Sequence, residues 1–448
     1  MDLKNKKVNN ITEKTKEKYD INYNNYPLYN VKRGLRNDDG TGVLAGLTSV
    51  GEVRGYIIDD GERVPIEGRL RYRGVDVRKI VNACYNERRF GYEEVMFLLL
   101  YGYLPDKEAL NEFYHVLGEM RNLPVSFTED MIMKAPSKNI MNKLASAVLS
   151  MYSYDEEPDA TDLNNLIRQS LEIIARLPAI ISYAYQTKRH YYDNGSFILH
   201  SPRADYSTAE NILHMIRPDS KFTRFEAEVL DLMLILHAEH GGGNNSAFVC
   251  RVASSTGTDT YSAIAAAIGS LKGPKHGGAN QKVMAMMADI KKNVKDWSND
   301  EEISNYLRRI INKEVGDKSG LVYGMGHAVY SLSDPRAVML KTKAKELAIE
   351  KGCMKEFALY DAIERLTPDI FAEIKKNNKV ICANVDLYSG LVYTMLDIPE
   401  DLFTPLFAVA RCVGWCAHRI EEISNSKIIR PAYKNICHRV DYIPMSER

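Results

Sequence analysis

The sequence predicts a mainly α-helical fold with little β-structure, and three observations support this. Most of the chain beyond residue 107 falls into runs with helical periodicity that begin or end at capping residues. Strand-like runs are few, and no repeated alternation of strands and helices is present. Neither a GxGxxG sequence after a strand nor a P-loop occurs. We therefore expect helices packed on helices.

The expected elements follow in order along the chain. Residues 52–74 alternate apolar and polar side chains around Asp60 and Gly61, which predicts a small hairpin. Leu104-Pro105-Asp106 predicts the start of a helix. The expected helices are 107–120, 224–237 (apolar almost all round and therefore buried), 258–271 with Asp259 as N-cap, 280–292, 335–352 capped by Asp334, and an amphipathic helix over 401–423. A short strand is expected at Val380–Val385.

Composition narrows the class of protein. The 448 residues contain 59 Lys plus Arg and 59 Asp plus Glu, so no net charge favours nucleic acid or an anionic membrane. The seven cysteines form no CxxC pair. The first residues are polar without an apolar signal region, and no run of 18 apolar residues occurs. We expect a cytoplasmic protein whose polar residues 1–35 form a loosely attached arm.

The first segment that could carry chemistry is 272–280, where His276 lies between two expected helices. A histidine at a helix N-terminus meets the positive end of the helix dipole, which lowers its pKa and favours the neutral ring. Such a ring can donate a hydrogen bond to a carbonyl that is becoming an enolate. Taken alone, the segment is more typical of a solvent-exposed turn histidine.

In the second segment, Gly324 and Gly326 directly precede His327. Glycines let the backbone approach a ligand and leave its N–H and C=O groups free. Arg336 follows in the first turn of the next helix, and its planar fork suits a carboxylate. A glycine loop without any ligand remains the alternative for this segment.

Two further segments leave their interpretation open. Asp386 follows a short apolar run and precedes a helix, where Asp is more often an N-cap than a catalytic base. His237 and His240, at the end of the buried helix, could share a metal, although no further ligand stands at a plausible spacing. Arg411 and Arg430, taken singly, are typical of surface or ion-pair arginines.

Jointly, these segments resemble the citrate synthase family. The resemblance covers the chain from about Gly34 to the C-terminus, and the strings occur in the family's order: HAEHGGGNNS, LKGPKHGGAN, GMGHAVYSLSDPRA, NVDLYSG and ARCVGW followed by IIRP. It implies that acetyl-CoA condenses with oxaloacetate and water to give citrate and CoA. It implies no bound cofactor and no metal, with acyl-CoA as a cosubstrate.

The resemblance also assigns roles to residues of this chain. Asp386 would remove a proton from the methyl carbon of the thioester, His276 would stabilise the enolate, and His327 would act as the acid on the ketone of oxaloacetate. The positions that match the family's oxaloacetate ligands are His240, His327, Arg336, Arg411 and Arg430. In the family the last arginine comes from the partner subunit, so we expect a homodimer with a shared active site.

Coenzyme A contacts are expected from backbone around the glycine loop, at Val322, Gly324, Met325 and Gly326. The chain departs from many bacterial members at Ala328, at Ser331 and at Ala432, where the family commonly has basic residues. Lys379 is a candidate replacement for the missing phosphate contacts.

The family fold implies two helical domains after the arm. A large domain would comprise 36–276 and 396–448, and a smaller closing domain would comprise 277–395. Closure after oxaloacetate binds would complete the site and keep water from the thioester.

Three alternatives stay open at this point. A 2-methylcitrate synthase would use propionyl-CoA with the same three catalytic residues, because one methylene is worth only about 1–3 kcal/mol in a pocket. A metal-dependent hydrolase would use His237 and His240. A non-catalytic helical scaffold would have no need of His276, His327 and Asp386 together.

Overall fold

The computed structural model describes residue 12 and residues 21–60, 62–376, 380–425 and 427–448. The chain divides into two compact units, one of residues up to Gly46 together with Arg430–Arg448, the other spanning Leu47–Ile429. The expected boundaries of a closing domain at residues 277 and 395 stay a prediction.

The described part of the first unit contains little regular structure. It comprises α2 (Asn25–Leu28) and two short 3-10 helices, Arg33–Leu35 and Met445–Glu447. No residue of α2 is buried. Most of the expected N-terminal arm, 1–11 and 13–20, lies outside the described residues.

The sheet of the second unit is small and antiparallel. Its strands are β1 (Gly51–Asp59), β2 (Glu62–Tyr72) and β3 (Val75–Asp76), in the order β1-β2-β3. The hairpin expected at 52–74 is thus confirmed, and its turn residue Gly61 lies outside the described residues.

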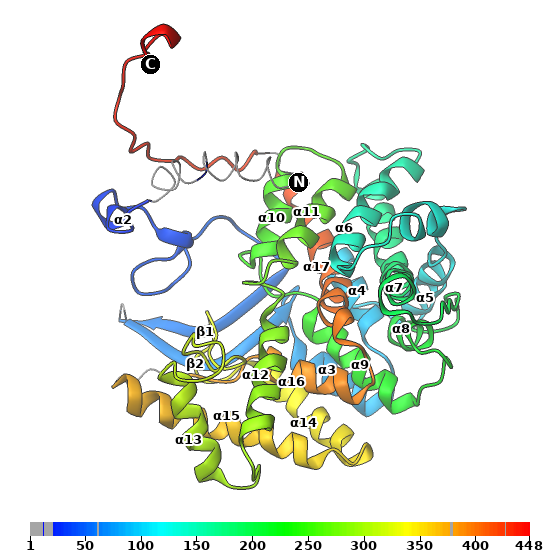
Figure 1. Cartoon of the computed structure of the whole chain (residues 1–448). Coiled ribbons are helices and arrows are strands. Elements are labelled where there is room, and N and C mark those ends of the chain that lie inside the picture. Colours follow the sequence, from blue (N-terminus) through cyan, green and yellow to red (C-terminus); the bar gives the residue numbers. More distant parts are fainter. Residues whose placement is uncertain (1–11, 13–20, 61, 377–379, 426) are drawn as a thin grey trace. The chain divides into compact units, whose positions relative to one another are not determined.

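Helices form most of the second unit (Figure 1). The earlier ones are α3 (Val77–Glu87), α4 (Tyr92–Tyr101), α5 (Lys107–Met120), α6 (Ile140–Met151), α7 (Leu163–Asp193), α8 (Thr208–Ile216) and α9 (Arg224–His237). The later ones are α10 (Asn245–Ser254), α11 (Thr260–Leu271), α12 (Ala279–Asn293), α13 (Asp300–Ile311), α14 (Pro335–Glu350), α15 (Met354–Lys375), α16 (Val385–Met395) and α17 (Phe403–Asn425). Short turns of helix occupy Thr128–Met133, Tyr152–Tyr154 and Glu400–Leu402. Within the described ranges, none of these helices combines the length and apolar character needed to cross a membrane.

Side-chain caps explain why several helices begin where the sequence predicts. Asp106, Asp259 and Asp334 are N-caps of α5, α11 and α14, and each accepts a backbone N–H of the first turn. Such a bond satisfies one of the donors that have no partner within the helix. The mainly helical fold is confirmed.

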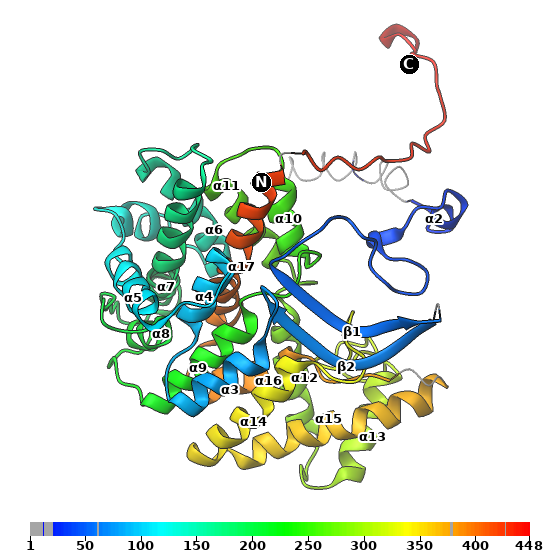
Figure 2. The same ribbon diagram turned by 180° about the vertical axis from the view of Figure 1, so that it is seen from behind.

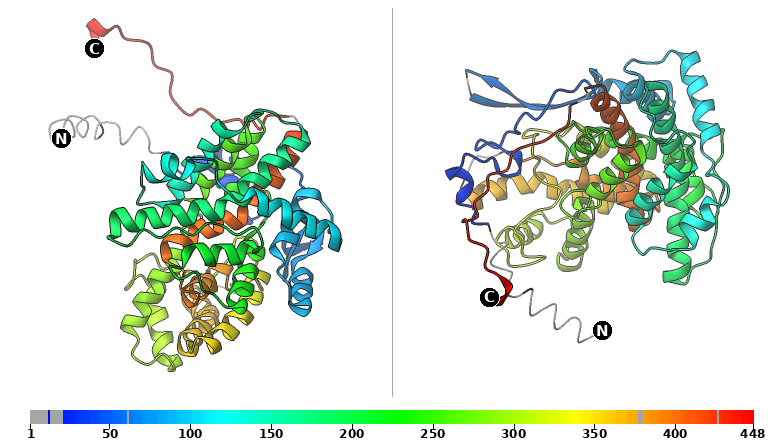
Figure 3. Two further views of the ribbon diagram at one scale, coloured as in Figure 1. Left: turned by 90° about the vertical axis from the view of Figure 1, so that its right-hand side faces the viewer. Right: turned by 90° about the horizontal axis from the view of Figure 1, so that it is seen from above.

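Two local expectations were wrong. Helix α17 is not amphipathic but buried along most of its length, because it contacts α4, α7, α9, α10 and α11. Both views of Figure 3 show it, coloured orange to red, among other helices. The described residues 380–385 form no strand; they make only an isolated antiparallel bridge between Ala383 and Met325.

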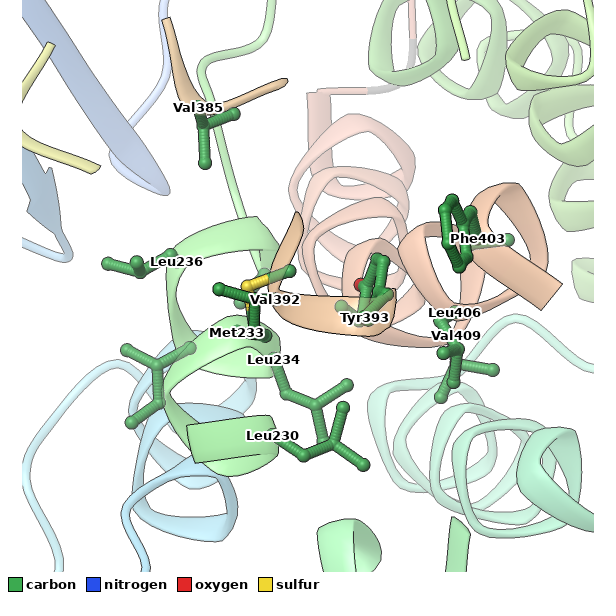
Figure 4. Packing of buried hydrophobic residues seen from close by; sticks show 14 of the residues in the cluster. Leu230, Met233, Leu234, Leu236, Val385, Val392, Tyr393, Phe403, Leu406 and Val409 are labelled. Atoms are coloured by element: carbon green, nitrogen blue, oxygen red, sulfur yellow. The ribbon is translucent and has the colours of Figure 1, made fainter. Parts of the chain in front are cut away.

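The apolar packing of α9, α16 and α17 forms the base on which the candidate site lies (Figure 4). Leu230, Leu234, Val392, Leu406 and Val409 from these helices are fully buried. Each helix also carries a residue singled out from the sequence: α9 ends at His237, α16 has Asp386 in its first turn, and α17 contains Arg411.

Helices α12 to α16 pack on one another beside the hairpin, as the contacts of α16 with α12 and α14 and of α14 with β2 record (Figure 2). The loop 312–334, which carries His327, joins α13 to α14 within this group.

Candidate active site

A short backbone ladder joins the glycine loop to the segment before α16. The Gly326 N–H donates to the Cys382 carbonyl at 2.7 Å, and the Asn384 N–H donates to the Gly324 carbonyl at 2.9 Å. The Asn384 side chain donates to the Gly326 carbonyl at 2.9 Å, across 58 residues of sequence.

This ladder shows that the backbone groups of the glycine loop are not all free, although this was expected, and it explains how His327 and Asp386 come close together. The Gly324 carbonyl and both backbone groups of Gly326 are used within the chain, so they are not free for a ligand. Gly324 has a φ of +84°, and a Cβ there would lie 2.9 Å from the Cα of Leu387, so glycine permits the close approach. As a result His327 and Asp386, which follow the two paired segments, are brought to one place.

His327 is held in a defined tautomer. Its Nδ1 accepts the backbone N–H groups of Val329 at 3.0 Å and Tyr330 at 3.1 Å. In the neutral ring the proton therefore lies on Nε2. The ring stacks on Tyr330 at 4.6 Å and meets the edge of His240 at 5.3 Å between ring centroids.

The β1–β2 hairpin supports the residues that follow His327. The Gly68 N–H donates to the Ser333 hydroxyl at 3.3 Å, and that hydroxyl donates to Glu67. A Cβ on Gly68 would lie 2.2 Å from the Ser333 carbonyl oxygen, and one on Gly55 would lie 2.6 Å from the Val329 oxygen. The hairpin and the loop are therefore in direct backbone contact.

Asp386 is not the N-cap of α16. The cap is Asn384, whose side chain accepts the Asp386 N–H at 3.0 Å. Burial raises the pKa of the Asp386 carboxyl to about 6, with the charge of Asp334 adding to the effect and Arg336 and Arg411 opposing it. The group is thus a stronger base near neutral pH than an exposed aspartate.

His276 lies between α11 and α12, half-buried rather than on an exposed turn. Its Nε2 is 3.0 Å from the Ser246 hydroxyl and accepts the Ser246 N–H at 3.4 Å, so the ring proton lies on Nδ1. The pKa of His276 is lowered to about 4 by burial and by Arg411, which keeps the ring neutral. The neutral ring was expected, and burial is the largest cause of the lowered pKa.

Arg411 is fully buried and incompletely bonded. Its Nε donates to the His237 carbonyl at 2.6 Å, whereas Nη1 and Nη2 have no hydrogen-bond partner among the described residues. Nε2 of His240 is likewise buried and unpartnered within that part of the chain. Buried polar groups are nearly always hydrogen-bonded, so these atoms mark a place for a polar ligand. The pKa of His240 is lowered by burial first, then by Arg336, His327 and Arg411.

Only part of the Arg336 guanidinium is available to a ligand, whereas the sequence suggested that the whole group would be. Its Nε and Nη2 donate to the buried carboxylate of Asp334 at 3.1 and 2.7 Å. One edge of the planar fork is therefore occupied within the chain, which orients the group and leaves the remaining edge for a ligand.

Comparison with known proteins identifies the family. The profile of the family described as citrate synthase, C-terminal domain, matches residues 39–432. The chain belongs to the citrate synthase family. Citrate synthases are acyltransferases whose substrates are oxaloacetate and an acyl-CoA, and they need no metal or prosthetic group.

Individual members of the family are similar over most of their length. The citrate synthase of Synechocystis is 32% identical over 85% of this chain and 89% of its own. The 2-methylcitrate synthase 1 of Corynebacterium glutamicum is also 32% identical, over 93% and 98%. The citrate synthase of Thermoplasma acidophilum, solved with carboxymethyl coenzyme A and oxaloacetate, has a TM-score of 0.75 at 27% identity and covers 93% of this chain and 99% of its own.

Three further residues singled out from the sequence are Arg430, Lys379 and His237. Arg430 belongs to the first unit and is exposed, and Lys379 lies outside the described residues. His237 donates from Nδ1 to the Met233 carbonyl at 2.7 Å, and burial lowers its pKa to about 3. In the described ranges, no three His, Cys, Asp or Glu side chains are grouped as metal ligands, so a metal-dependent hydrolase at His237 and His240 lacks a third ligand there.

Sequence reasoning missed four residues in or beside the candidate site. Ser246 fixes the ring of His276, and Trp415 donates to the Ser246 hydroxyl at 3.1 Å. Glu239 and His418 form a fully buried hydrogen-bonded pair at 2.9 Å. Ser246 and Glu239 lay within the string HAEHGGGNNS, whose polar residues other than histidine were the overlooked signal.

Proposed function

We propose that this citrate synthase family member condenses acetyl-CoA with oxaloacetate and water to give citrate and CoA, with His276, His327 and Asp386 as the catalytic residues. The observation that carries the proposal is the buried Arg411, whose Nη1 and Nη2 have no partner among the described residues, together with hydrogen bonds that orient the rings of His276 and His327. Asp386 is a carboxylate of raised basicity, which suits a base. His276 is a neutral ring with its proton on Nδ1, which suits a hydrogen-bond donor to the enolate. His327 has its proton on Nε2, which suits an acid.

In the first step, Asp386 takes a proton from the methyl carbon of the thioester. With a pKa of about 6 the carboxylate is mostly ionised at pH 7 and is still more basic than an exposed aspartate. A positioned base contributes about 10²–10⁴ in rate. The enolate therefore needs further stabilisation, which the Nδ1–H of neutral His276 supplies by donating to the thioester oxygen.

In the second step, the enolate carbon attacks the ketone of oxaloacetate, a carbon–carbon bond forms, and Nε2 of His327 gives its proton to the ketone oxygen. Water then cleaves the carbon–sulfur bond of the citryl thioester, releasing citrate and CoA. Arg411, the open edge of Arg336, and His240 hold the dicarboxylate. Arg430 from the partner subunit completes this set.

The coenzyme site includes the glycine loop at Val322, Gly324, Met325 and Gly326. Some backbone groups of this loop form hydrogen bonds within the chain, and these fix the conformation of the loop. The remaining backbone groups contact the coenzyme. Homodimer formation, a cytoplasmic location and closure of a domain over 277–395 stay predictions.

Steady-state kinetics with acetyl-CoA and propionyl-CoA test the proposal. A 2-methylcitrate synthase is the second candidate, because relatives of both names are 32% identical to this chain. We expect the higher kcat/KM with acetyl-CoA; a clear preference for propionyl-CoA would overturn that choice and keep the condensation chemistry. Loss of activity to a chelator, with stoichiometric metal in the purified protein, would instead favour the hydrolase.

A further inference from the structure

Glu239 is a buried carboxylate that lies between His237 and His240 in the sequence. It is 0% exposed. Its Oε1 accepts hydrogen bonds from Nε2 of His418 at 2.9 Å and from the Gly241 N–H at 2.5 Å, whereas Oε2 has no partner among the described residues. The proposed reaction gives this group no task.

We propose that Glu239 is an internal counter-ion of Arg411 that sets how strongly the site binds the oxaloacetate dianion. In the empty enzyme its negative charge balances the buried guanidinium, and the bound substrate carboxylate competes with it for that charge. The inference rests on the proposed function for the identity of the anion.

Packing confines the carboxylate to the helix that carries Arg411. A Cβ on Gly414, three residues beyond Arg411 on α17, would lie 2.6 Å from Oε2 of Glu239. On the other side, a Cβ on Gly51 would lie 2.8 Å from Cγ. Glycine at both positions lets α17 and β1 close on the carboxylate, so it has little room to turn away from α17.

His418 is the side chain that bonds to this carboxylate, from Nε2 to Oε1. Nη2 of Arg251 lies 2.6 Å from Nδ1 of His418, and a guanidinium has only donors. Nδ1 therefore accepts, and the proton of a neutral ring lies on Nε2, where it is donated to Glu239. The charge of Arg251 is itself matched by Glu421 and Glu422. His418 thus orients the carboxylate of Glu239 through this hydrogen bond.

Arg411 is the buried cation that needs this charge. Burial lowers its pKa to about 10, Glu239 is the largest opposing influence, Arg336 adds to the lowering, and Tyr72 and Asp386 oppose it. Burial raises the pKa of Glu239, but His418 and Arg411 hold it below its usual value. An uncompensated buried charge costs several kcal/mol, so the two groups stabilise each other.

The test is Glu239→Gln, which keeps the size of the side chain and the acceptor for His418 and Gly241 but removes the charge. Calorimetry with oxaloacetate alone should show binding about 10-fold tighter than wild type, and the ligand-free variant should melt at a lower temperature. Glu239→Asp, which keeps the charge, should bind within about threefold of wild type. A purely structural role predicts weaker binding, so the direction of the change discriminates.

The matched control is Glu93→Gln, a fully buried carboxylate elsewhere that accepts the Thr208 N–H and the Tyr114 hydroxyl. It should lower the melting temperature and leave oxaloacetate affinity unchanged. Should Glu239→Gln fail to fold alone, the inference requires that added oxaloacetate or citrate restores folding.

Each possible result of these experiments either supports or overturns the inference. Unchanged or weaker oxaloacetate binding by folded Glu239→Gln, or no rescue of an unfolded variant by either anion, overturns the inference and leaves the proposed function standing. Absence of oxaloacetate binding by the wild-type protein overturns the proposed function and the inference with it.

Discussion

Replacing Arg411 by methionine should remove most of the affinity for oxaloacetate. Two of its nitrogens, Nη1 and Nη2, are buried and have no partner among the described residues, so a bound carboxylate would satisfy both. Hydrogen bonds to charged groups are worth about 1.5–3 kcal/mol each. The loss is therefore about 3 kcal/mol or more, equivalent to at least about 100-fold in the dissociation constant.

Arg419 on the same helix is the matched control. It is also fully buried, but its nitrogens are bonded to Thr260 at 3.0 Å, Ser254 at 3.2 Å and the Thr258 carbonyl at 2.7 Å. Arg419→Met loses three hydrogen bonds of a charged group at about 1.5–3 kcal/mol each, so it should lower the free energy of unfolding by about 4 kcal/mol or more and leave oxaloacetate affinity unchanged.

Two measurements separate the variants. Calorimetric titration gives the dissociation constant, and thermal unfolding with and without oxaloacetate gives the stabilisation by ligand, which is about 2.7 kcal/mol at 100 times the dissociation constant. Wild type and Arg419→Met should melt higher with ligand, and Arg411→Met should not at the same concentration. If Arg411→Met bound oxaloacetate within threefold of wild type, the reasoning from unpartnered atoms would be refuted.

Four further predictions concern the base, its pH dependence, the second arginine and the hairpin. Asp386→Asn should lower kcat by about 10²–10⁴ with oxaloacetate binding nearly intact, and near-normal turnover would remove Asp386 as the base. Because its carboxyl has a pKa raised to about 6, the base is ionised above that pH, and kcat/KM of wild type should fall as pH drops below about 6; a flat profile down to pH 5 would contradict this. Arg336→Leu should cause a large loss of oxaloacetate affinity, and an unchanged calorimetric dissociation constant would exclude it from the site. Gly68→Ala should lower kcat, since its Cβ would lie 2.2 Å from the Ser333 carbonyl and displace the loop after His327, whereas Gly269→Ala, with open space around it, should leave kcat unchanged.

Helix boundaries were predictable where a local interaction sets them. The N-caps Asp106, Asp259 and Asp334 bond to backbone groups only two or three residues away, so sequence spacing contains the needed information. The hairpin at 52–74 is equally local, because its strands are joined by a short turn.

Long-range contacts explain the expectations that were wrong. The helix expected to be amphipathic at 401–423 is buried on most sides, since α17 contacts seven other described helices, α4, α6, α7, α9, α10, α11 and α12. The described segment 380–385 pairs with the glycine loop through a single bridge, Ala383 to Met325, so it forms no strand. The same pairing uses the glycine backbone groups that were expected to be free.

From sequence alone, the helical class and the resemblance to citrate synthase followed, because capping, periodicity and motif order depend on residues close together in the chain. Tertiary structure alone decided the ring tautomers of His276 and His327, the raised basicity of Asp386 and the unpartnered nitrogens of Arg411. It also decided that Glu239, unremarked within its motif, lies against α17. Protonation and charge balance depend on burial and on neighbours from distant segments, which no spacing along the chain encodes.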